Sequence, residues 1–485
     1  MNYDKYSKES IISYGKKLEN YSLLDLYSSS IIEHVSNSKK GKGDLGVLIE
    51  KFHFNYEPNS DPGPDFSEAE LELKTSKLES FKDKKKGYRP KERLKLKSIN
   101  YNEIFDKNFE STLLFKKIVD ILFVYYEDDD RNKKAYEKKI KIVAHWNLPK
   151  EDIEIIKKDY ETIVDKIDDG FAHELSDGDT YLLAASTSGN SKLKNQKNSS
   201  IKAKERSFTF KNHYNQFILK QILLREYSEK EWSEYSELLG KKVTHESIKE
   251  EQYTSIDSII IKLKDSVGKS CKEILGVAEE FSEKDKSFYS RVTKSIIGDE
   301  QENIKIIQKT GVVIRSVRIS ENNSIDESVS FPAFKFFEIF NQEWEESEFY
   351  ERVNSKFIFV FYKKRNNGEY YLEKVREWHM PYKDREECRK VWLDTKDLIS
   401  TGNIFKGYAM DKNTGKVRLS KKGNPIRYNN LPKPSHPICH VRPHAKDSND
   451  TFPLPVEDKI LNVKEYTKQC FWIKNQYILD NVFLE

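Results

Sequence analysis

The chain has 485 residues, of which 37% are hydrophobic and 12% aromatic, and its net charge is +4. This composition excludes a globally disordered chain and allows two to four domains, each with its own core. Charged residues make up 34% of the sequence, so a surface for nucleic acid must come from local clusters rather than from the overall charge.

The four cysteines lie in the second half without a Cys-x-x-Cys pair, which favours a reduced, cytoplasmic protein. The sequence shows no apolar leader and no stretch of about 18 apolar residues, so we expect no membrane partner. Residues 267–270 resemble the end of a phosphate-binding loop, but Leu263 stands where that pattern requires its first glycine. We therefore expect no nucleotide cofactor.

The chain opens with a helical pattern at residues 23–34, followed by a Lys-rich turn at residues 39–43. An apolar-periodic segment then ends at Glu50. The periodicity predicts a helix that carries Glu50 and faces the next element.

The most informative stretch contains Asp65, Glu72 and Lys74. Residues 70–74 alternate Glu-Leu-Glu-Leu-Lys, which as a strand directs Glu70, Glu72 and Lys74 to one face, with Asp65 at a preceding turn. Two such carboxylates offer hard oxygen ligands for Mg²⁺, which stabilises charge on a phosphate and lowers the pKa of its water. Lys74 is placed to orient or deprotonate that water. Alternating Glu and Leu is also typical of any half-solvated strand; the rest of the sequence favours the metal-dependent phosphodiesterase.

A basic region, residues 82–97, separates this strand from an apolar run at residues 118–126. The run predicts a buried strand with Lys116 and Lys117 at its entrance. The acidic run that follows, residues 127–130, is predicted to be a solvated turn rather than a set of metal ligands.

Two later segments are predicted to be connections. Residues 186–206 are rich in Ser, Asn, Gly and Lys, which predicts a mobile loop that could order on phosphates. The Glu-rich stretch at residues 225–250 is predicted to join two domains.

Three segments of the second half repeat segments of the first half in the same order. Residues 208–214 (FTFKNHY) and 471–477 (FWIKNQY) are identical at four of seven positions. The other two echoes pair residues 121–126 with 357–362 and residues 70–78 with 311–319. The repeats indicate duplicated domains.

The catalytic positions differ between the two halves. The aligned positions are Glu72 with Val313, Lys74 with Arg315, and Asp65 with Ile306. Because valine and isoleucine cannot hold Mg²⁺, we expect the second half to keep a nuclease-like fold without nuclease chemistry.

We therefore predict an α/β fold of two tandem domains, each a mixed central sheet flanked by helices, which makes the chain a pseudo-dimer. The predicted boundaries are residues 1–224 for the catalytic domain, 225–250 for the connecting segment and 251–485 for a second domain without the catalytic motif.

The residues of the first motif together resemble a known family. They are Lys42-Gly43, Gly46, Leu48-Ile49-Glu50, Asp65-Phe66 and Glu72-Leu73-Lys74-Thr75. They resemble MutH, the mismatch-repair nicking endonuclease of the PD-(D/E)XK class. The spacing of the three acids in that family is matched to within one residue by Glu50, Asp65 and Glu72. With two MutH-like halves and one intact motif, the chain is similar to the Sau-type GATC restriction endonucleases, whose second half acts as an effector-binding domain.

The resemblance implies a set of active-site residues. Asp65 and Glu72 would be the metal ligands, Lys74 the water-orienting lysine and Glu50 an accessory acid. A second active-site lysine is also implied, for which counting back from the buried strand selects Lys117 and leaves its neighbour Lys116 open.

DNA contacts are implied in both halves. Lys42 matches a DNA-contacting lysine of the family, although solubility explains a Lys-rich turn equally well. Lys211 and Lys474 share one position of the repeated segment and are further predicted contacts.

Residues 440–445 (HVRPHA) resemble the family's base-reading segment. Arg442 could bond guanine O6 and N7 together, which discriminates by roughly 1–3 kcal/mol, with His444 beside it. The matching first-half segment, residues 181–188, has no arginine, which leaves Ser186, Thr187 or the loop at residues 189–198 to read bases.

A zinc site at the one histidine and cysteine cluster is not predicted, because the spacing fits no standard finger. The cluster consists of His436, Cys439, His440 and His444.

The resemblance implies a Mg²⁺-dependent type II restriction endonuclease that cuts double-stranded DNA at 5′-GATC-3′, before the guanine. A palindromic site has two scissile phosphates and one chain has one active site, so we expect a monomer in solution and a dimer or looped complex that holds two sites on DNA. A MutH-like nickase, a non-catalytic DNA-binding repressor and an RNA nuclease are the alternatives. The sequence leaves open the response to methylation and the number of metal ions.

Overall fold

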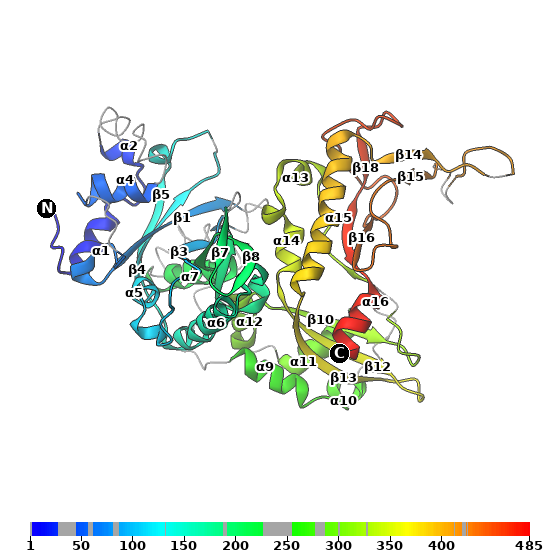
Figure 1. Cartoon of the computed structure of the whole chain (residues 1–485), viewed down its shortest axis with the longest axis horizontal. Helices are drawn as coiled ribbons and strands as arrows, with labels where there is room; N and C mark the ends of the chain where they lie inside the picture. The colour runs from blue at the N-terminus through cyan, green and yellow to red at the C-terminus, as the bar shows by residue number, and fades with distance from the viewer. Residues whose placement is uncertain are drawn as a thin grey trace. The chain divides into compact units, whose positions relative to one another are not determined.

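The computed structural model describes residues 2–27, 45–56, 62–80, 87–130, 132–187, 192–226, 255–276, 287–298, 301–325, 328–411, 413–419, 423 and 425–485. The structure is mixed α/β and divides into two compact units (Figure 1). Unit 1 comprises Met1–Ser186, Lys192–Tyr253 and Lys305–Gly311, and unit 2 comprises Thr187–Ser191, Thr254–Ile304 and Val312–Glu485.

Unit 1 is built on a four-stranded sheet with the strand order β2-β1-β4-β5. Its strands are β1 (Glu72–Ser80), β2 (Tyr88–Pro90), β4 (Asp120–Glu127) and β5 (Ile140–Asn147). Strands β1 and β4 are parallel, whereas the other two pairs are antiparallel. The predicted buried strand is confirmed as β4, which is buried on both faces from Asp120 to Tyr126.

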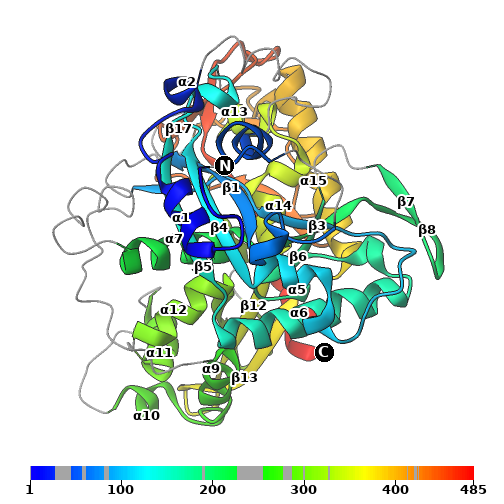
Figure 2. The same cartoon turned by 90° about the vertical axis from the view of Figure 1, so that its left-hand side faces the viewer.

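N-terminal helices cover one face of this sheet, and the first two have side-chain N-caps. They are α1 (Lys8–Lys16), α2 (Leu23–Leu26) and α4 (Leu45–Leu48), which continues into the π-helix η1 (Ile49–His53). Helix α1 packs on β5 (Figure 2), and α4 packs on β1. The predicted opening helix is confirmed for α2, and residues 28–34 of that prediction lie outside the described residues.

The other face of the sheet carries the larger core of unit 1. This core includes apolar side chains of β4 and β5 and of the covering elements. The covering elements are α5 (Leu113–Ile118), α6 (Lys150–Asp168), α7 (Asn212–Glu226) and a sheet of order β3-β9-β6, formed by β3 (Leu94–Ser98), β9 (Arg206–Phe210) and β6 (Leu183–Thr187). Short 3-10 helices link these elements: η2 (Ser67–Ala69), η4 (Phe109–Ser111), η5 (Ala135–Glu137), η6 (Ala172–Glu174) and η7 (Asp177–Asp179).

The prediction of a mobile loop at residues 186–206 is wrong over most of its length. Strands β7 (Leu193–Gln196) and β8 (Ser199–Lys204) form an antiparallel hairpin there (Figure 2). The buried side chain of Gln196 donates to the Ile201 carbonyl at 2.6 Å and accepts from the Ala172 amide at 2.8 Å. These bonds anchor the hairpin to η6. The polar composition of the segment does not reveal this anchoring.

A buried ion pair lies at the end of α12 (Gln301–Thr310), in the part of that helix that belongs to unit 1. Lys309 is bonded to Asp152, which also accepts from the Tyr214 hydroxyl at 2.6 Å. Both charged side chains are almost fully buried, at 3% and 0% exposure. A buried pair of this kind is costly to break from one side only.

Unit 2 contains a three-stranded sheet of order β10-β12-β13. Its strands are β10 (Val313–Ile319), β12 (Lys356–Lys364) and β13 (Tyr370–His379). Strand β10 is parallel to β12, and β12 is antiparallel to β13, which are the directions of β1, β4 and β5 in unit 1. Both antiparallel pairs also carry a register shift, at Tyr125/Tyr126 and at Phe361/Tyr362.

The remaining elements of unit 2 pack around this sheet or extend from it. Its helices are α9 (Ile256–Lys264), α10 (Cys271–Leu275), α11 (Phe288–Ile297), α13 (Phe336–Asn341), η9 (Trp344–Glu346), α14 (Glu348–Val353), α15 (Tyr382–Thr401), α16 (Asn475–Ile478) and η10 (Leu479–Leu484). A second sheet has the order β11-β19-β16, formed by β11 (Val329–Ser330), β19 (Gln469–Ile473) and β16 (Cys439–Pro443). Two short pairs join β14 (Phe405–Tyr408) to β15 (Arg427–Asn429) and β17 (Thr451–Pro453) to β18 (Glu465–Thr467).

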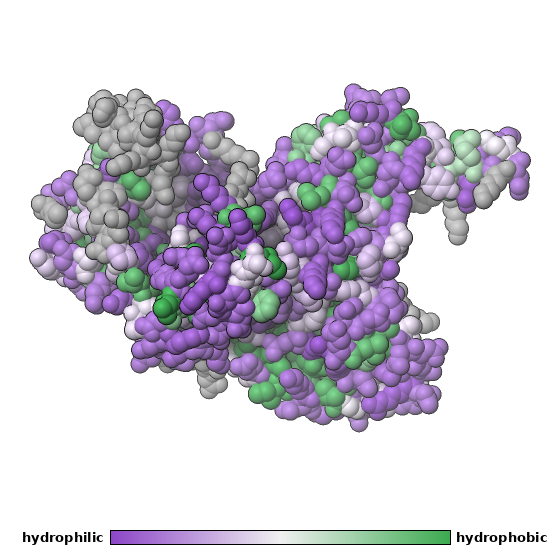
Figure 3. Space-filling model, in the orientation of Figure 1, coloured by the Kyte–Doolittle hydropathy of each residue, from purple (hydrophilic) through white to green (hydrophobic). Residues whose placement is uncertain are grey.

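The described surface is mainly hydrophilic on the face shown in Figure 3, and its apolar residues are scattered there. Within the described part of the chain, no helix is both long and apolar enough to cross a membrane.

Candidate active site

A tight turn brings Asp65 and Glu72 together at the start of β1. Phe66 bridges to Leu71, and Glu70 adopts the left-handed conformation, with φ of 51°, at the end of η2. The strand therefore begins at Glu72, and the prediction that Glu70 lies on it is wrong. The Asp65 carboxylate accepts from the Leu73 amide at 2.9 Å, and the Glu72 carboxylate accepts from the Asp65 amide at 3.2 Å.

Two lysines converge on the carboxylate of Glu72. The Glu72 side chain is fully buried, and Lys74, two residues along β1, is bonded to its Oε1. Lys117, on α5, lies 3.1 Å from both carboxylate oxygens. Lys116 is exposed, so the structure brings Lys117 rather than its neighbour to the site.

The donor set of this cluster suits a hard divalent cation. Asp65 and Glu72 supply carboxylate oxygens whose orientation is fixed by backbone amides of the same turn. Among the described residues, no group of three or more His, Cys, Asp and Glu side chains is arranged to hold a metal ion. The two acids thus form a pair, and water and phosphate oxygens would have to complete the shell of Mg²⁺, which usually keeps several waters.

The accessory residues Glu50 and Lys42 are placed differently. Glu50 lies in η1, as the predicted helix requires, and the helix before it packs on β1. Its carboxylate is not part of a three-acid metal-binding group within the described residues. Lys42 lies outside the described residues, so its predicted DNA contact stays a prediction.

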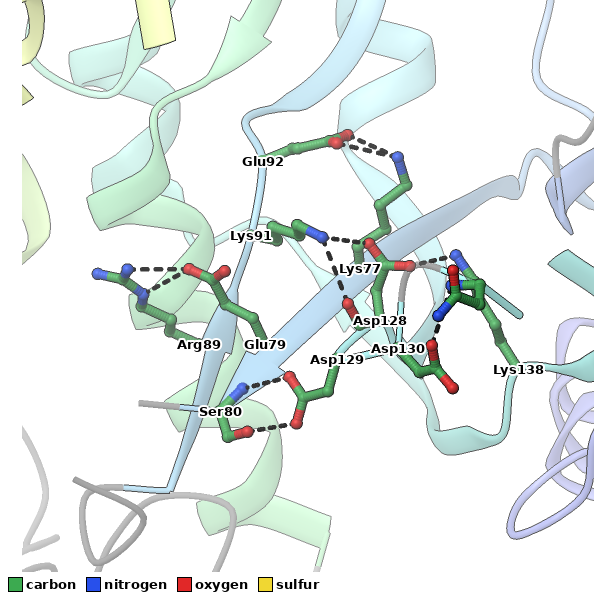
Figure 4. Close-up of polar contacts among 11 residues, drawn as sticks. Lys77, Glu79, Ser80, Arg89, Lys91, Glu92, Asp128, Asp129, Asp130 and Lys138 are labelled. Carbon is green, nitrogen blue, oxygen red and sulfur yellow. Dashed lines mark hydrogen bonds and ion pairs between the residues drawn. The ribbon is translucent and has the colours of Figure 1, made fainter. Parts of the chain in front are cut away.

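The acidic run after β4 is held by lysines, as Figure 4 shows. Asp128 is bonded to Lys91, at 2.6 Å, and to Lys138, and it is buried rather than solvated. Asp129 accepts from the amide of Ser80 at 2.9 Å and from its hydroxyl. The predicted turn is present, and Asp129 and Asp130 are exposed as expected. Asp128 is the exception, because a sequence pattern does not show the lysines that neutralise it.

The predicted base-reading residues of unit 2 lie on an exposed part of its second sheet. Arg442 is exposed on β16, with its guanidinium carbon 5.0 Å from the centre of the Trp472 ring on β19. The ring of His444, also exposed, lies 5.9 Å from the same indole. A cation and two rings at a sheet surface can contact bases by hydrogen bonds and by stacking.

His440 is buried, unlike Arg442 and His444. Both of its ring nitrogens lack a hydrogen-bond partner among the residues that the structure describes. Burial and, to a smaller extent, the charge of Arg442 lower the pKa of His440 to about 4. Its imidazole is therefore neutral near pH 7, and as residue i−2 of the same strand it lies on the face of β16 that carries Arg442.

The repeated lysines have different surroundings. Lys211 is buried, and its ammonium donates to the carbonyls of Asp177, at 2.5 Å, and of Thr180. This placement favours a structural role over the predicted DNA contact. Lys474 is half-buried at the N-cap of α16, and its amide donates to the Ile438 carbonyl at 2.8 Å.

One arginine of unit 1 was missed by the sequence reasoning. Arg93 donates to the Ser186 hydroxyl at 3.0 Å and forms an ion pair with Asp177 at 2.6 Å. Ser186 is the fourth residue of β6, as Arg442 is of β16. Arg93, from the connection between β2 and β3, thus reaches the segment of unit 1 that has no arginine of its own, residues 181–188. The only sequence signal for this arginine was the basic region at residues 82–97.

Comparisons with known proteins show which family the chain resembles. The profile of the family described as the DNA mismatch repair enzyme MutH matches residues 54–159, which include both acids and both lysines of the cluster. The chain is also 30% identical, over 505 residues, to the type II restriction enzyme Sau3AI of Staphylococcus aureus. That alignment covers 98% of each chain.

Proposed function

Because the chain belongs to the MutH-like restriction endonucleases, we propose that it is a Mg²⁺-dependent type II enzyme that cleaves double-stranded DNA before the guanine of 5′-GATC-3′. The observation that carries the proposal is the convergence of the Asp65 amide, Lys74 and Lys117 on the buried carboxylate of Glu72. The choice of GATC rests on the resemblance of the sequence motifs to the Sau-type enzymes.

The side chains of the cluster divide the chemistry between them. Asp65 and Glu72 would hold Mg²⁺, which when bound lowers the pKa of water and offsets phosphate charge. The ammonium of Lys74 orients the attacking water and donates to the phosphate oxygens as negative charge builds there. Water attacks phosphorus, the bond to the 3′-oxygen breaks, and that oxygen takes a proton, so the ends carry a 5′-phosphate and a 3′-hydroxyl. Lys117, at 3.1 Å from both Glu72 oxygens, offsets the charge of this carboxylate and orients it.

We further propose that the two halves of the chain are tandem MutH-like domains, with residues 1–224 catalytic, 225–250 connecting and 251–485 binding a second GATC site. The shared strand order, directions and register shift of the two sheets support this division. Val313 replaces the catalytic glutamate in unit 2, so that unit would bind DNA without cutting it.

An effector role for unit 2 has a direct test. DNA bound there can accelerate cleavage only if it contacts the cleavage-competent assembly more strongly than other states. A plasmid with one GATC should be cut slowly, and a short GATC duplex added in trans should accelerate cutting, whereas a duplex of scrambled sequence should not. Equal rates with the two duplexes would remove the effector role and leave the nuclease proposal standing.

A strand-nicking repair enzyme is the second candidate, favoured by the match to the mismatch repair family. It would share the site and the chemistry but cut one strand. Supercoiled plasmid would then accumulate as open circles, whereas the proposed restriction enzyme should produce linear DNA.

A further inference from the structure

Unit 2 keeps two cations at the places where unit 1 holds its catalytic lysines. The strand register fixes the first. Glu72 pairs with Ile121 in unit 1, and Val313 pairs with Phe357 in unit 2. Two residues further along each strand, Lys74 is matched by Arg315.

The second matched cation is identified by its place in the helix that precedes β4 in unit 1 and β12 in unit 2. Helices α5 and α14 both follow a 3-10 turn and a hydroxyl N-cap, which accepts from the third helical amide in each case. Lys117 is the fifth residue of α5, and Arg352 is the fifth residue of α14. Arg315 and Arg352, hereafter the arginine pair, thus correspond to Lys74 and Lys117.

The acid between the two cations is missing from unit 2. Val313 at the glutamate position packs against the apolar core. The Nε atoms of Arg315 and Arg352 are buried without a hydrogen-bond partner in the part of the chain that is described. Glu348 lies 3.2 Å from Nη2 of Arg352, but this i,i+4 pair is largely exposed and offsets only part of the charge.

The two guanidinium groups also affect one another. Burial, and then the charge of Arg352, lower the pKa of Arg315. A partly buried cation that faces a second cation is unfavourable unless an anion compensates it. Guanidinium groups present several N–H donors whose geometry matches the oxygens of a phosphate.

We propose that the arginine pair binds a backbone phosphate of DNA held by unit 2, at the place where unit 1 would hold the scissile phosphate. This proposal rests on the proposed binding of DNA by unit 2 and names the contact that anchors it. The phosphate stays intact there because Val313 supplies no oxygen ligand.

Thermal unfolding of the full chain in phosphate and in chloride at equal ionic strength tests the anion site without DNA. Phosphate should raise the unfolding temperature of the wild type, because a ligand of the folded state stabilises it by mass action. Arg315→Met should lose part of that rise while folding normally, since methionine removes a buried charge at similar volume. Arg318→Met is the matched control: Arg318 lies on the same strand but its guanidinium faces the Tyr289 ring, at 5.6 Å.

Titration of labelled GATC duplex in EDTA tests the DNA arm. The wild type should bind two duplexes, and Arg315→Met and Arg352→Met should each weaken one step about tenfold. The salt dependence of that step should fall by about one unit of slope, as expected when one phosphate contact is lost. Arg315→Lys should recover part of the affinity, and Arg318→Met should bind like the wild type.

The outcomes separate the two proposals. If the methionine variants lose the phosphate-specific rise in unfolding temperature but bind the duplex as the wild type does, the arginine pair binds free phosphate and not DNA. If both the rise and the duplex affinity are unchanged, the pair binds no phosphate. Either result overturns the proposal. Weaker binding of one duplex by the methionine variants supports it, whether or not free phosphate also binds. If the wild type binds only one duplex, the effector function fails, and the thermal arm alone then decides whether the arginine pair is an anion site.

Discussion

Replacement of Lys117 by methionine tests the geometry of the candidate active site. The ammonium of Lys117 lies 3.1 Å from each oxygen of a carboxylate whose side chain is fully buried, and the lysine side chain itself is only 14% exposed. Methionine keeps much of the side-chain volume but removes the charge and the donors. Glu72 would then keep Lys74 and the Asp65 amide as its partners.

The expected losses follow from that contact list. A charge-assisted hydrogen bond to a buried group contributes about 1–3 kcal/mol, so the free energy of unfolding should fall by that amount rather than by the larger cost of an unpaired buried charge. Loss of one group that stabilises charge in the transition state typically lowers the rate by about 10²–10³-fold.

The assay is single-turnover cleavage of a GATC duplex in Mg²⁺, together with urea unfolding of the same preparations. Lys116→Met is the matched control, because Lys116 is the exposed neighbour on the same helix and should change stability by no more than about 0.5 kcal/mol. Lys117→Arg should keep more activity than Lys117→Met. Full activity of Lys117→Met, or a greater loss in Lys116→Met, would refute the assignment.

Three further predictions address other parts of the chain. Glu72→Ala should abolish cutting while site binding measured in EDTA persists, and Val313→Ala should cut like the wild type; a cutting Glu72→Ala enzyme would place the chemistry elsewhere. Lys309→Met should destabilise the protein by about 3–5 kcal/mol in urea unfolding, because it leaves Asp152 buried without its cation, and the double variant with Asp152→Asn should recover part of the loss. The pKa of His440 is lowered to about 4 in the folded chain, whereas an unfolded histidine has a pKa of about 6.5. Between these two values the unfolded chain binds a proton at His440 and the folded chain does not. The free energy of unfolding should therefore decrease, by up to about 3 kcal/mol, as the pH is lowered from about 6.5 to about 4. His440→Leu should remove that part of the pH dependence, and an unchanged pH profile would contradict the burial argument.

Sequence patterns predicted the parts of the fold that follow local rules. The apolar run of β4 and the face shared by Glu72 and Lys74 follow from strand periodicity, and both are present. The repeated segments also predicted the register in which Val313 takes the position of Glu72. Each of these features can be seen in short segments, taken singly or compared with one another.

Features that depend on distant partners were not predictable from one sequence. Gln196 orders a hairpin in a polar segment through bonds to Ala172 and Ile201, and Lys211 is buried against backbone carbonyls. The alignment of the two halves also fails at the pair Asp65 and Ile306. Ile306 is buried on a helix, whereas Asp65 lies in a turn. Arg93 reaches Ser186 across 93 positions of the chain, a separation that no local pattern encodes.

Sequencing of the ends produced from plasmid in Mg²⁺, with EDTA added to stop the reaction, tests the central claim most directly. The account predicts linear products whose every end lies immediately before the guanine of GATC and carries a 5′-phosphate. Intact plasmid, or ends scattered over unrelated sequences, would contradict it.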